Sequence, residues 1–217
     1  LDLLLTAQHR SRKLLTHGSN TATLDVMGRP RTFDDDAVID RAMEEFWSNG
    51  YHATSPARLA EATGLAKGSL YNAFTSKRAL FDKCLDRYHQ QITDLAKGLL
   101  DHPGSTRECL ADALRSVVDS DLAQPQRRGC LIGNTAVELA GHDPEIARTL
   151  RRMQDESTSW FADRIRRGQS VGDVRPDLDA NAFAQHLATT LAGLRVMAMT
   201  HDAPALYGVI DTALTGL

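Results

Sequence analysis

The chain has 217 residues, of which 42% are hydrophobic and 24% are charged, and its formal net charge at pH 7 is −3. This length suits one compact domain joined to a small one and is ample for a buried core. The acidic balance excludes a generally basic coat for nucleic acid, so a nucleic-acid surface has to be local. Residues 101–217 hold twelve Lys and Arg against sixteen Asp and Glu, whereas residues 27–100 hold ten of each. The front of the chain is therefore better suited to meet phosphate.

The sequence lacks the signatures of several protein classes. Its three cysteines, Cys84, Cys109 and Cys130, form no Cys-x-x-Cys pair, so neither a disulfide framework nor a zinc knuckle is indicated. No apolar run approaches the roughly 18 residues of a membrane span. The eight histidines show no metal-binding spacing, and there is no phosphate-cradling glycine loop or serine elbow. We expect a cytoplasmic, non-enzymatic protein without a metal, a cofactor or a membrane partner.

Residues 1–26 fit nothing that follows them in the chain. We interpret them as a dispensable extension, or a product of an upstream start or of cloning, that is mostly disordered. The alternative is a basic arm lying along DNA. Arg29 and Arg31 follow on a stiff tail that contains a proline. Arginines on such a tail can enter a narrow minor groove, and the alternative is a solvated basic tail.

A first helix is predicted from about 35 to 49. Asp34-Asp35-Asp36 provides acidic residues for its first turn, where they complement the helix dipole. Ala42, Met43 and Phe46 recur at helical spacing and indicate one apolar face. This helix is expected to brace the elements that come after it.

The stretch from Thr54 to Lys77 is predicted to be two short helices joined by a tight turn. Ser55 can cap the first helix, and Pro56 suits its first position. Gly64 supplies the left-handed residue that closes it. Two such helices form a helix-turn-helix unit, whose second helix enters the DNA major groove. The alternative is that both are core helices of an all-helical domain.

Ordered motifs fill the segment from Arg31 to Gln90. They are Phe33, Ala42, Phe46, Gly50-Tyr51, Ala53-Thr54-Ser55, Leu59-Ala60, Gly64-Leu65, Lys67-Gly68-Ser69-Leu70-Tyr71, Phe74, Ser76-Lys77 and Leu80-Phe81. With these motifs the segment closely resembles the N-terminal DNA-binding domain of the TetR family of bacterial repressors. Two positions depart from the family pattern. Ala66 stands where a hydroxyl residue usually caps the recognition helix, and Ala73 stands where histidine is frequent.

The resemblance and the helix geometry together imply DNA contacts. Lys67, Ser69 and Asn72 are expected to reach base edges, with Gly68 allowing a close backbone approach. Phosphate contacts are expected from Thr54, Ser55, Tyr71 and Lys77, whereas Arg58 suits either kind of contact.

From residue 76 onward the sequence is predicted to be all helix. Ser76 caps a long helix to about residue 100, which in the family is the lever between ligand pocket and DNA. Proline and glycine clusters then separate helices at 106–122, 130–141, 143–168, 179–200 and 203–215. The fold class is therefore all-α. We predict a helix-turn-helix domain at 27–75 with its motif at 55–74, a connecting helix at 76–100, and an effector-binding and dimerisation domain at 101–217. Gly129-Cys130-Leu131-Ile132 and Glu138-Leu139-Ala140 give this last region a resemblance to TetR-type ligand-binding domains.

The resemblance implies a homodimer that binds a palindromic double-stranded DNA operator and is released by a small-molecule effector. The last two helices are expected to pair with those of a second subunit, and the alternative is that they are core. The predicted interface residues are Phe183, Leu187, Leu191, Gly193, Leu194, Leu206, Val209, Ile210, Ala213 and Leu214. Candidate effector contacts, each with a core position as its alternative, are Cys109, Cys130, Asn134, Glu138, Met153, Trp160, His186, Met197 and Met199.

Two other functions stay open. Cys130 has Arg127, Arg128 and a helix N-terminus near it, which would favour a thiolate that senses oxidants or electrophiles. The alternative is an inert, buried cysteine. A helical adaptor would use the same fold for protein contacts alone, and the absence of salt-dependent DNA binding would distinguish it from a repressor.

Overall fold

The computed structural model describes residues 34–217, and in that range it consists of helices and the turns between them, without strands. The helices are α1 (Asp35–Asn49), α2 (Pro56–Thr63), α3 (Lys67–Phe74), α4 (Lys77–Leu100), α5 (Thr106–Ala123), α6 (Leu131–Leu139), α7 (Pro144–Ser170), α8 (Ala180–Met197) and α9 (Ala203–Ala213). The all-α prediction is confirmed, and every predicted helix in this range is present. The predictions for residues 1–26 and for Arg29 and Arg31 lie outside the described residues.

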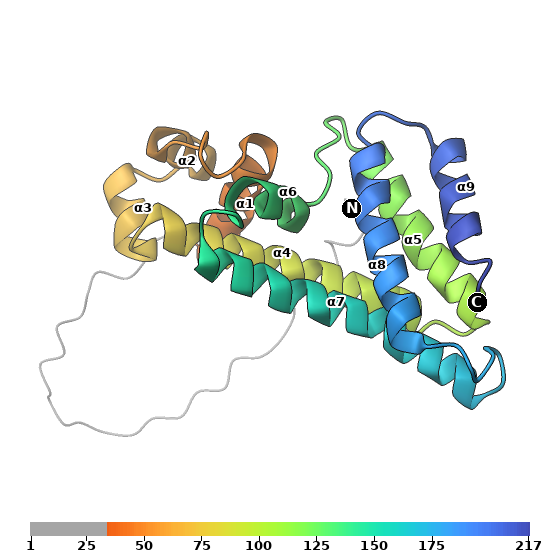
Figure 1. Ribbon diagram of the computed structural model, residues 1–217. Coiled ribbons are helices and arrows are strands. Elements are labelled where there is room, and N and C mark those ends of the chain that lie inside the picture. The colour runs from red at the N-terminus through yellow and green to blue at the C-terminus, as the bar shows by residue number, and fades with distance from the viewer. Residues whose placement is uncertain (1–33) are drawn as a thin grey trace, which may run out of the picture. The chain divides into compact units, whose positions relative to one another are not determined.

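Residues 35–217 form one compact unit in which two long helices connect the ends. Figure 1 shows α1, α2 and α3 together at one end, which we call the head, while α5, α8 and α9 gather at the other. α4 packs against α1 in the head and against α5 and α7 farther along. α6 packs on α4 and α7. None of the helices in the described range is long and apolar enough to cross a bilayer.

The caps predicted for the helix-turn-helix pair are present. The Arg58 backbone N–H donates to Ser55 Oγ at 3.2 Å, and Gly64 ends α2 with a φ of +71°. Ser76 Oγ likewise accepts the Ala79 N–H at 3.0 Å and starts α4. Ala66, at the N-cap of α3, offers no side-chain hydrogen bond, as its alanine side chain requires. The N-terminal N–H groups of α3 therefore lack a side-chain cap.

The core of the head holds α3 by its apolar side. Leu70 is fully buried and Phe74 is 3% exposed. Beneath the head, the rings of Phe46 in α1 and Phe81 in α4 meet edge to face with centroids 4.8 Å apart. Burial of such large side chains is the main stabilising term of a small helical unit. It fixes which side of α3 faces solvent.

The core of the other end corrects the predicted dimer interface. Leu187, Leu194, Leu206, Ile210 and Leu214 are all buried against α5 and α7 residues of the same chain. They are core because large apolar side chains on adjacent helices of one chain pack closely together and are removed from water. Phe183, Leu191 and Ala213 pack partly against this core, which leaves only Gly193 and Val209 of the predicted set on the open side.

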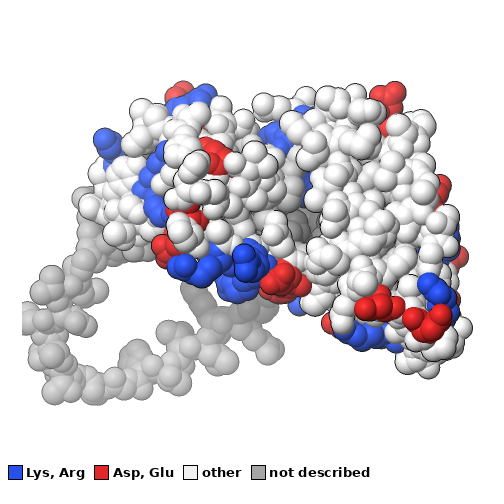
Figure 2. Space-filling model, in the orientation of Figure 1, with Lys and Arg blue, Asp and Glu red and all other residues white. Residues whose placement is uncertain are grey.

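The outward side of α8 is lined by small and uncharged residues. Gln185, Thr189, Ala192, Gly193 and Val196 are exposed at helical spacing, and Val196 is 67% exposed. On α9 the exposed positions Ala205, Gly208, Val209 and Thr212 form a similar stripe. Figure 2 shows that the surface over α8 carries almost no charged side chains.

Gly168 lies where α7 passes closest to its neighbours. A Cβ there would overlap Thr106 Oγ1 and would come within 2.7 Å of Val174 Cγ2. Gly98 stands in the last turn of α4, as Gly168 does in α7, and has nothing within 4 Å of the same position. The two helical glycines are therefore matched in secondary structure and opposite in packing.

We expect Gly168→Ala to lower the free energy of unfolding by roughly 1–3 kcal/mol, because the added methyl overpacks a tight contact. Gly98→Ala should raise it by roughly 0.5–1 kcal/mol, since alanine is the better helix former and finds open space. Chemical denaturation followed by circular dichroism measures both. Equal effects of the two substitutions would contradict the close packing at Gly168.

Candidate nucleic-acid interface

α3 presents polar side chains to solvent at its N-terminal end. Lys67, Ser69 and Asn72, the predicted base-reading residues, are all exposed. A Cβ at Gly68 would meet nothing within 4 Å, so the backbone there is open to close approach. The uncapped N–H groups at the start of α3 add the positive end of the helix dipole, which favours phosphate nearby. The surface suits the groove of a duplex.

Tyr71 lies half-buried beside this surface. Burial raises the pKa of the Tyr71 phenol, so it keeps its proton at neutral pH. A protonated phenol is a hydrogen-bond donor, which is the form that a phosphate oxygen accepts from.

The other predicted phosphate contacts are less uniform. The structure turns Thr54 inward: its side chain is fully buried, and its hydroxyl donates to the Gly50 carbonyl at 2.7 Å. Arg58 of α2 is exposed, but its side chain lies against α1. Its Nη1 is 3.1 Å from Asn49 Oδ1, and its Nε is 3.2 Å from Glu45 Oε1. Lys77 places Nζ 4.3 Å from the Tyr51 ring centroid. Ser55 keeps its hydroxyl hydrogen available, since Oγ only accepts at the α2 cap.

The turn after α1 is tied to α6 by one carboxylate. Glu138 Oε2 accepts the Tyr51 N–H at 2.9 Å, and Oε1 accepts the His52 N–H at 2.7 Å. Gly50 precedes these two N–H groups with a φ of +78°, and a Cβ there would lie 2.9 Å from Glu138 Oε2. A glycine is therefore required both by the backbone and by the carboxylate. Glu138 is a link between the head and the rest of the unit.

A second link joins α1 to the loop before α6. Trp47 Nε1 donates to the Gly129 carbonyl at 3.1 Å, and the Arg128 guanidinium lies 4.1 Å from the Trp47 ring centroid. Arg128 also pairs with Glu44 and donates to Ser48 Oγ at 3.2 Å. These contacts hold one side of α1 against residues 80 to 84 positions away in the chain.

Arg195 of α8 is the centre of the buried polar network behind these links. Its Nε and Nη2 donate to the two oxygens of Asp121, both at 2.8 Å, and the side chains are only 11% and 6% exposed. Nη1 donates to the Tyr88 hydroxyl at 2.8 Å, and Nη2 donates to the Gly129 carbonyl at 3.0 Å. Burial raises the pKa of Tyr88, so its hydroxyl stays neutral. A charge this buried needs its partner, because removing one leaves the other uncompensated.

Sequence reasoning missed this network, although it left one signal. Arg195 is the sole Lys, Arg, Asp or Glu in α8, a helix otherwise made of apolar, small and neutral polar residues. A lone charge in such a helix is more often paired inside than solvated outside. Its partner Asp121, in α5, could not be identified from spacing.

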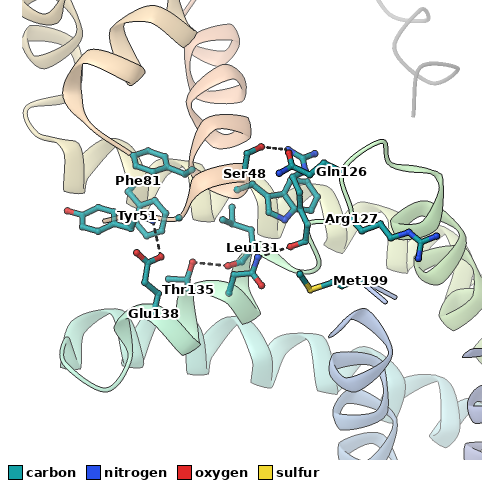
Figure 3. Close-up of a pocket in the computed structure, with 14 residues that line it drawn as sticks. Ser48, Tyr51, Phe81, Gln126, Arg127, Leu131, Thr135, Glu138 and Met199 are labelled. Carbon is teal, nitrogen blue, oxygen red and sulfur yellow. Dashed lines mark hydrogen bonds between the residues drawn. The ribbon is translucent and has the colours of Figure 1, made fainter. Parts of the chain in front are cut away.

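A cavity of about 220 Å³ lies between the head and α6. As Figure 3 shows, Tyr51 of the head lies opposite Leu131 and Glu138 of α6. Trp47 and Asn134 also line the cavity. Asn134, Glu138 and Met199 are the predicted effector contacts that line this cavity. A second opening, between α1 and α2, is lined by Glu45, Arg58, Glu61 and Ala62.

The other predicted effector contacts are not brought together. Cys109 is buried at the far end of the unit, where Sγ donates to the His102 carbonyl at 3.3 Å, and Met153 is buried in α7. Trp160 stacks on His89, with ring centroids 5.9 Å apart. His186 is exposed on α8 and Met197 is 36% exposed. These candidates do not line the cavity at α6, and helical spacing alone could not show this because it does not give the direction in which each helix faces.

Cys130 caps α6 rather than lining the cavity. Its Sγ accepts the Gly133 N–H at 3.4 Å and lies 3.8 Å from the Tyr88 hydroxyl, which donates to it. Arg127 donates to the carbonyls of Ala198 and His201. The basic residue linked to Cys130 by hydrogen bonds is Arg195, which donates to the Tyr88 hydroxyl. Among residues 34–217, no cluster of three or more His, Cys, Asp or Glu is arranged to hold a metal.

Comparison with protein-family models covers both parts of the described chain. The model for bacterial regulatory proteins of the tetR family matches residues 38–84, which include the helix-turn-helix pair. The model for tetracyclin repressor-like C-terminal domains matches residues 104–214.

Individual relatives agree with the family models. The HTH-type transcriptional repressor ComR of Escherichia coli (strain K12) is 33% identical over 175 residues, 79% of this chain and 82% of ComR. The uncharacterized HTH-type transcriptional regulator YezE of Bacillus subtilis (strain 168) is 32% identical over 194 residues, 88% of this chain and 100% of YezE. A cysteine variant of the TetR family regulator CifR, solved with 26-bp operator DNA, is 36% identical with a TM-score of 0.78, covering 86% of this chain and 98% of that one. Both family models match this chain, and its relatives are regulators of the same kind. Together with the exposed α3, these matches show that the chain belongs to the TetR family of DNA-binding transcriptional regulators.

Proposed function

We propose that the protein is a repressor that binds a palindromic operator as a homodimer and leaves it when a small-molecule effector binds. The observation that carries this proposal is the exposed polar side of α3, whose apolar side is fixed in the head by Leu70 and Phe74. The names of its relatives support repression, since ComR and DhaR are transcriptional repressors. The operator complex of CifR supports DNA as the partner.

In the proposed complex, α3 enters the major groove with its N-terminal end. Lys67 suits the acceptor atoms of guanine, and Asn72 suits the donor and acceptor pair of adenine. Tyr71, Ser55 and Lys77 are proposed to contact phosphate, which sets the register without reading sequence. Thr54 has no part in this proposal because its side chain is buried.

Asn72→Ala is expected to relax discrimination at one base pair by about 1–3 kcal/mol, because one base-edge contact is lost. Tyr71→Ala should weaken binding to all sequences alike, since a phosphate contact carries no sequence information. Selection of bound DNA from a random pool, followed by affinity measurement at fixed salt, separates the two. Gln91→Ala, at an exposed position on α4, is the control. Full operator affinity in both α3 variants would rule out this docking.

The proposed dimer uses the outward stripes of α8 and α9 rather than the leucines first predicted. Gly193 and Gly208 have open space where a side chain would stand, so a second helix can approach closely. Val196 and Val209, 67% and 37% exposed, provide apolar area that a partner would cover. A two-fold pair of chains through this face carries two copies of α3, which is why the operator is proposed to be palindromic.

Val196→Glu is expected to convert the dimer to monomer and to weaken operator binding, because a charge would be buried at the interface. Val137→Glu is the matched control, since Val137 is 92% exposed on α6, away from the stripe. Sedimentation velocity gives the mass of each variant. A dimer that survives Val196→Glu but not Val137→Glu would move the interface to α6.

Release from the operator is proposed to depend on the contacts between the head and the remaining helices. An effector changes DNA affinity only by its differential affinity for two arrangements of the protein. The head is held by α4, by Glu138 and by the contacts of Trp47, so an effector acting on these contacts changes the spacing of the two α3 helices. The coupling in such systems is typically about 1–3 kcal/mol and is reciprocal.

A second candidate function is redox or electrophile sensing through Cys130. The supporting observation is the chain of hydrogen bonds in which Arg195 donates to Tyr88 and Tyr88 donates to Cys130 Sγ. Cys130 is half-buried, unlike Cys84 and Cys109, which are buried. Burial raises the pKa of Cys84 strongly, which keeps that thiol protonated and inert.

If Cys130 senses oxidant, mild peroxide should reduce operator affinity of the wild type, and Cys130→Ser should abolish that response. The variant keeps Cys84 and Cys109, so it also controls for oxidation elsewhere. Electrophoretic mobility shift before and after treatment measures the response. A Cys130→Ser protein that still responds like the wild type excludes this function.

A further inference from the structure

We propose that the cavity between the head and α6 is the effector site and that it takes a small organic cation, an ammonium group on a compact apolar body. This inference deepens the proposed function and rests on it for its regulatory meaning. The cavity is formed by two parts of the molecule whose relative position decides DNA binding.

The walls of the cavity supply apolar contact from both sides. Trp47 and Tyr51 line it from the head. Leu131 lines it from α6, across from Tyr51 (Figure 3). Its rim includes Gln126, Asn134 and Met199, which are all exposed, so the cavity can be reached from solvent. At about 220 Å³ it is smaller than the roughly 300–1,000 Å³ of drug-sized pockets. A ligand of one ring or one short chain fits it.

The polar atoms in the cavity are mainly unfilled acceptors. Glu138 receives two backbone N–H bonds but has no Lys, Arg or His within ion-pair distance among residues 34–217. Each carboxylate oxygen keeps a further lone pair. The Asn134 amide donates through Nδ2 to the Arg128 carbonyl at 2.8 Å, and its Oδ1 receives no hydrogen bond within the described part of the chain. A ligand that donates hydrogen bonds is therefore favoured.

The arginines at the cavity do not reverse this preference. Arg128 is paired with Glu44 and lies over the Trp47 ring. Arg127 donates to the carbonyls of Ala198 and His201, and Figure 3 shows its guanidinium directed away from Glu138. Glu138 forms no ion pair in the described range, and Lys77, whose Nζ lies over the Tyr51 ring, is the cation that interacts with its charge at longer range. An ammonium group inside the cavity gains a direct charged hydrogen bond to this carboxylate.

Occupation of the site changes the link to the head directly. An ammonium group bound at the free lone pairs of Glu138 draws negative charge from the oxygens that accept the Tyr51 and His52 N–H groups. Weakening of these two bonds loosens the turn after α1, and with it the placement of α3. The ligand therefore binds better to the arrangement in which the head is released, which lowers operator affinity.

The test uses Trp160→Phe, which leaves Trp47 as the one tryptophan. The probes are 2-phenylethylammonium, neutral 2-phenylethanol and anionic phenylacetate, which share a ring and differ in charge. We expect a saturable change of Trp47 fluorescence with the ammonium probe at concentrations where the other two give none. Adding Glu138→Gln should weaken that binding by about tenfold or more, because a charged hydrogen-bond partner is lost. Asp155→Asn, an exposed acid on α7, should leave it unchanged.

Circular dichroism shows whether Glu138→Gln still folds. Met199→Ala, at the exposed rim of the cavity, is a second variant. It is expected to weaken binding of the ammonium probe a few-fold because apolar contact is lost. Operator affinity of the wild type should fall at least about fivefold at a saturating concentration of the ammonium probe. Phenylacetate binding as tightly as the ammonium, or ammonium binding unaffected by Glu138→Gln and Met199→Ala, would overturn the site. The site would also be overturned if protein that is able to bind the operator shows, when free of DNA, no saturable binding of the ammonium probe. If no DNA is bound under any condition but the fluorescence results hold, the site stands and the repressor function fails.

Discussion

The buried guanidinium of Arg195 is the interaction on which the arrangement of the helices depends. It comes from α8 and is neutralised by Asp121 of α5, while its remaining N–H groups reach Tyr88 of α4 and the Gly129 carbonyl. A charge so poorly exposed is tolerated only when every donor has an acceptor, so its position fixes the mutual registration of three helices and one loop.

The Gly129 carbonyl carries this constraint onward to the head. It accepts from Arg195 on one side and from Trp47 Nε1 on the other, so α1 is held to the same point as α8. Glu138 adds a second attachment at the turn after α1. α3 packs on α2 and α4, and α2 packs on α1, while Leu70 and Phe74 of α3 are buried, so the direction of α3 follows from the position of these helices. The proposed DNA-binding surface is thus positioned in part by contacts outside the head.

The two faces of α8 illustrate how the same helix serves one chain and, in the proposed assembly, two. Its leucines are used inside the chain, where they fill the core against α5, α7 and α9. The glycine, alanines and valine on the other side are too small to form a core alone. They suit close contact between two helix surfaces, in which backbone approach matters more than side-chain volume. The size of the side chains, rather than their hydrophobicity alone, distinguishes the side of α8 that packs in the core from the side proposed to contact a second chain.

The sequence by itself determined the elements: Ser55, Gly64 and Ser76 fixed helix ends because caps and left-handed residues act locally, and the ordered motifs from Arg31 to Gln90 identified the DNA-binding pair. It also predicted exposure for Lys67, Ser69 and Asn72, since Leu70 and Phe74 mark the opposite side of a short helix. Only the tertiary structure decided that Thr54 is buried, that the leucines of α8 and α9 are core, and that Glu138 and Trp47 lie across one cavity. These facts depend on which residues far apart in the chain meet. Helical period fixes which residues share a face, but the direction of that face is set by long-range packing and by buried pairs such as Asp121 and Arg195.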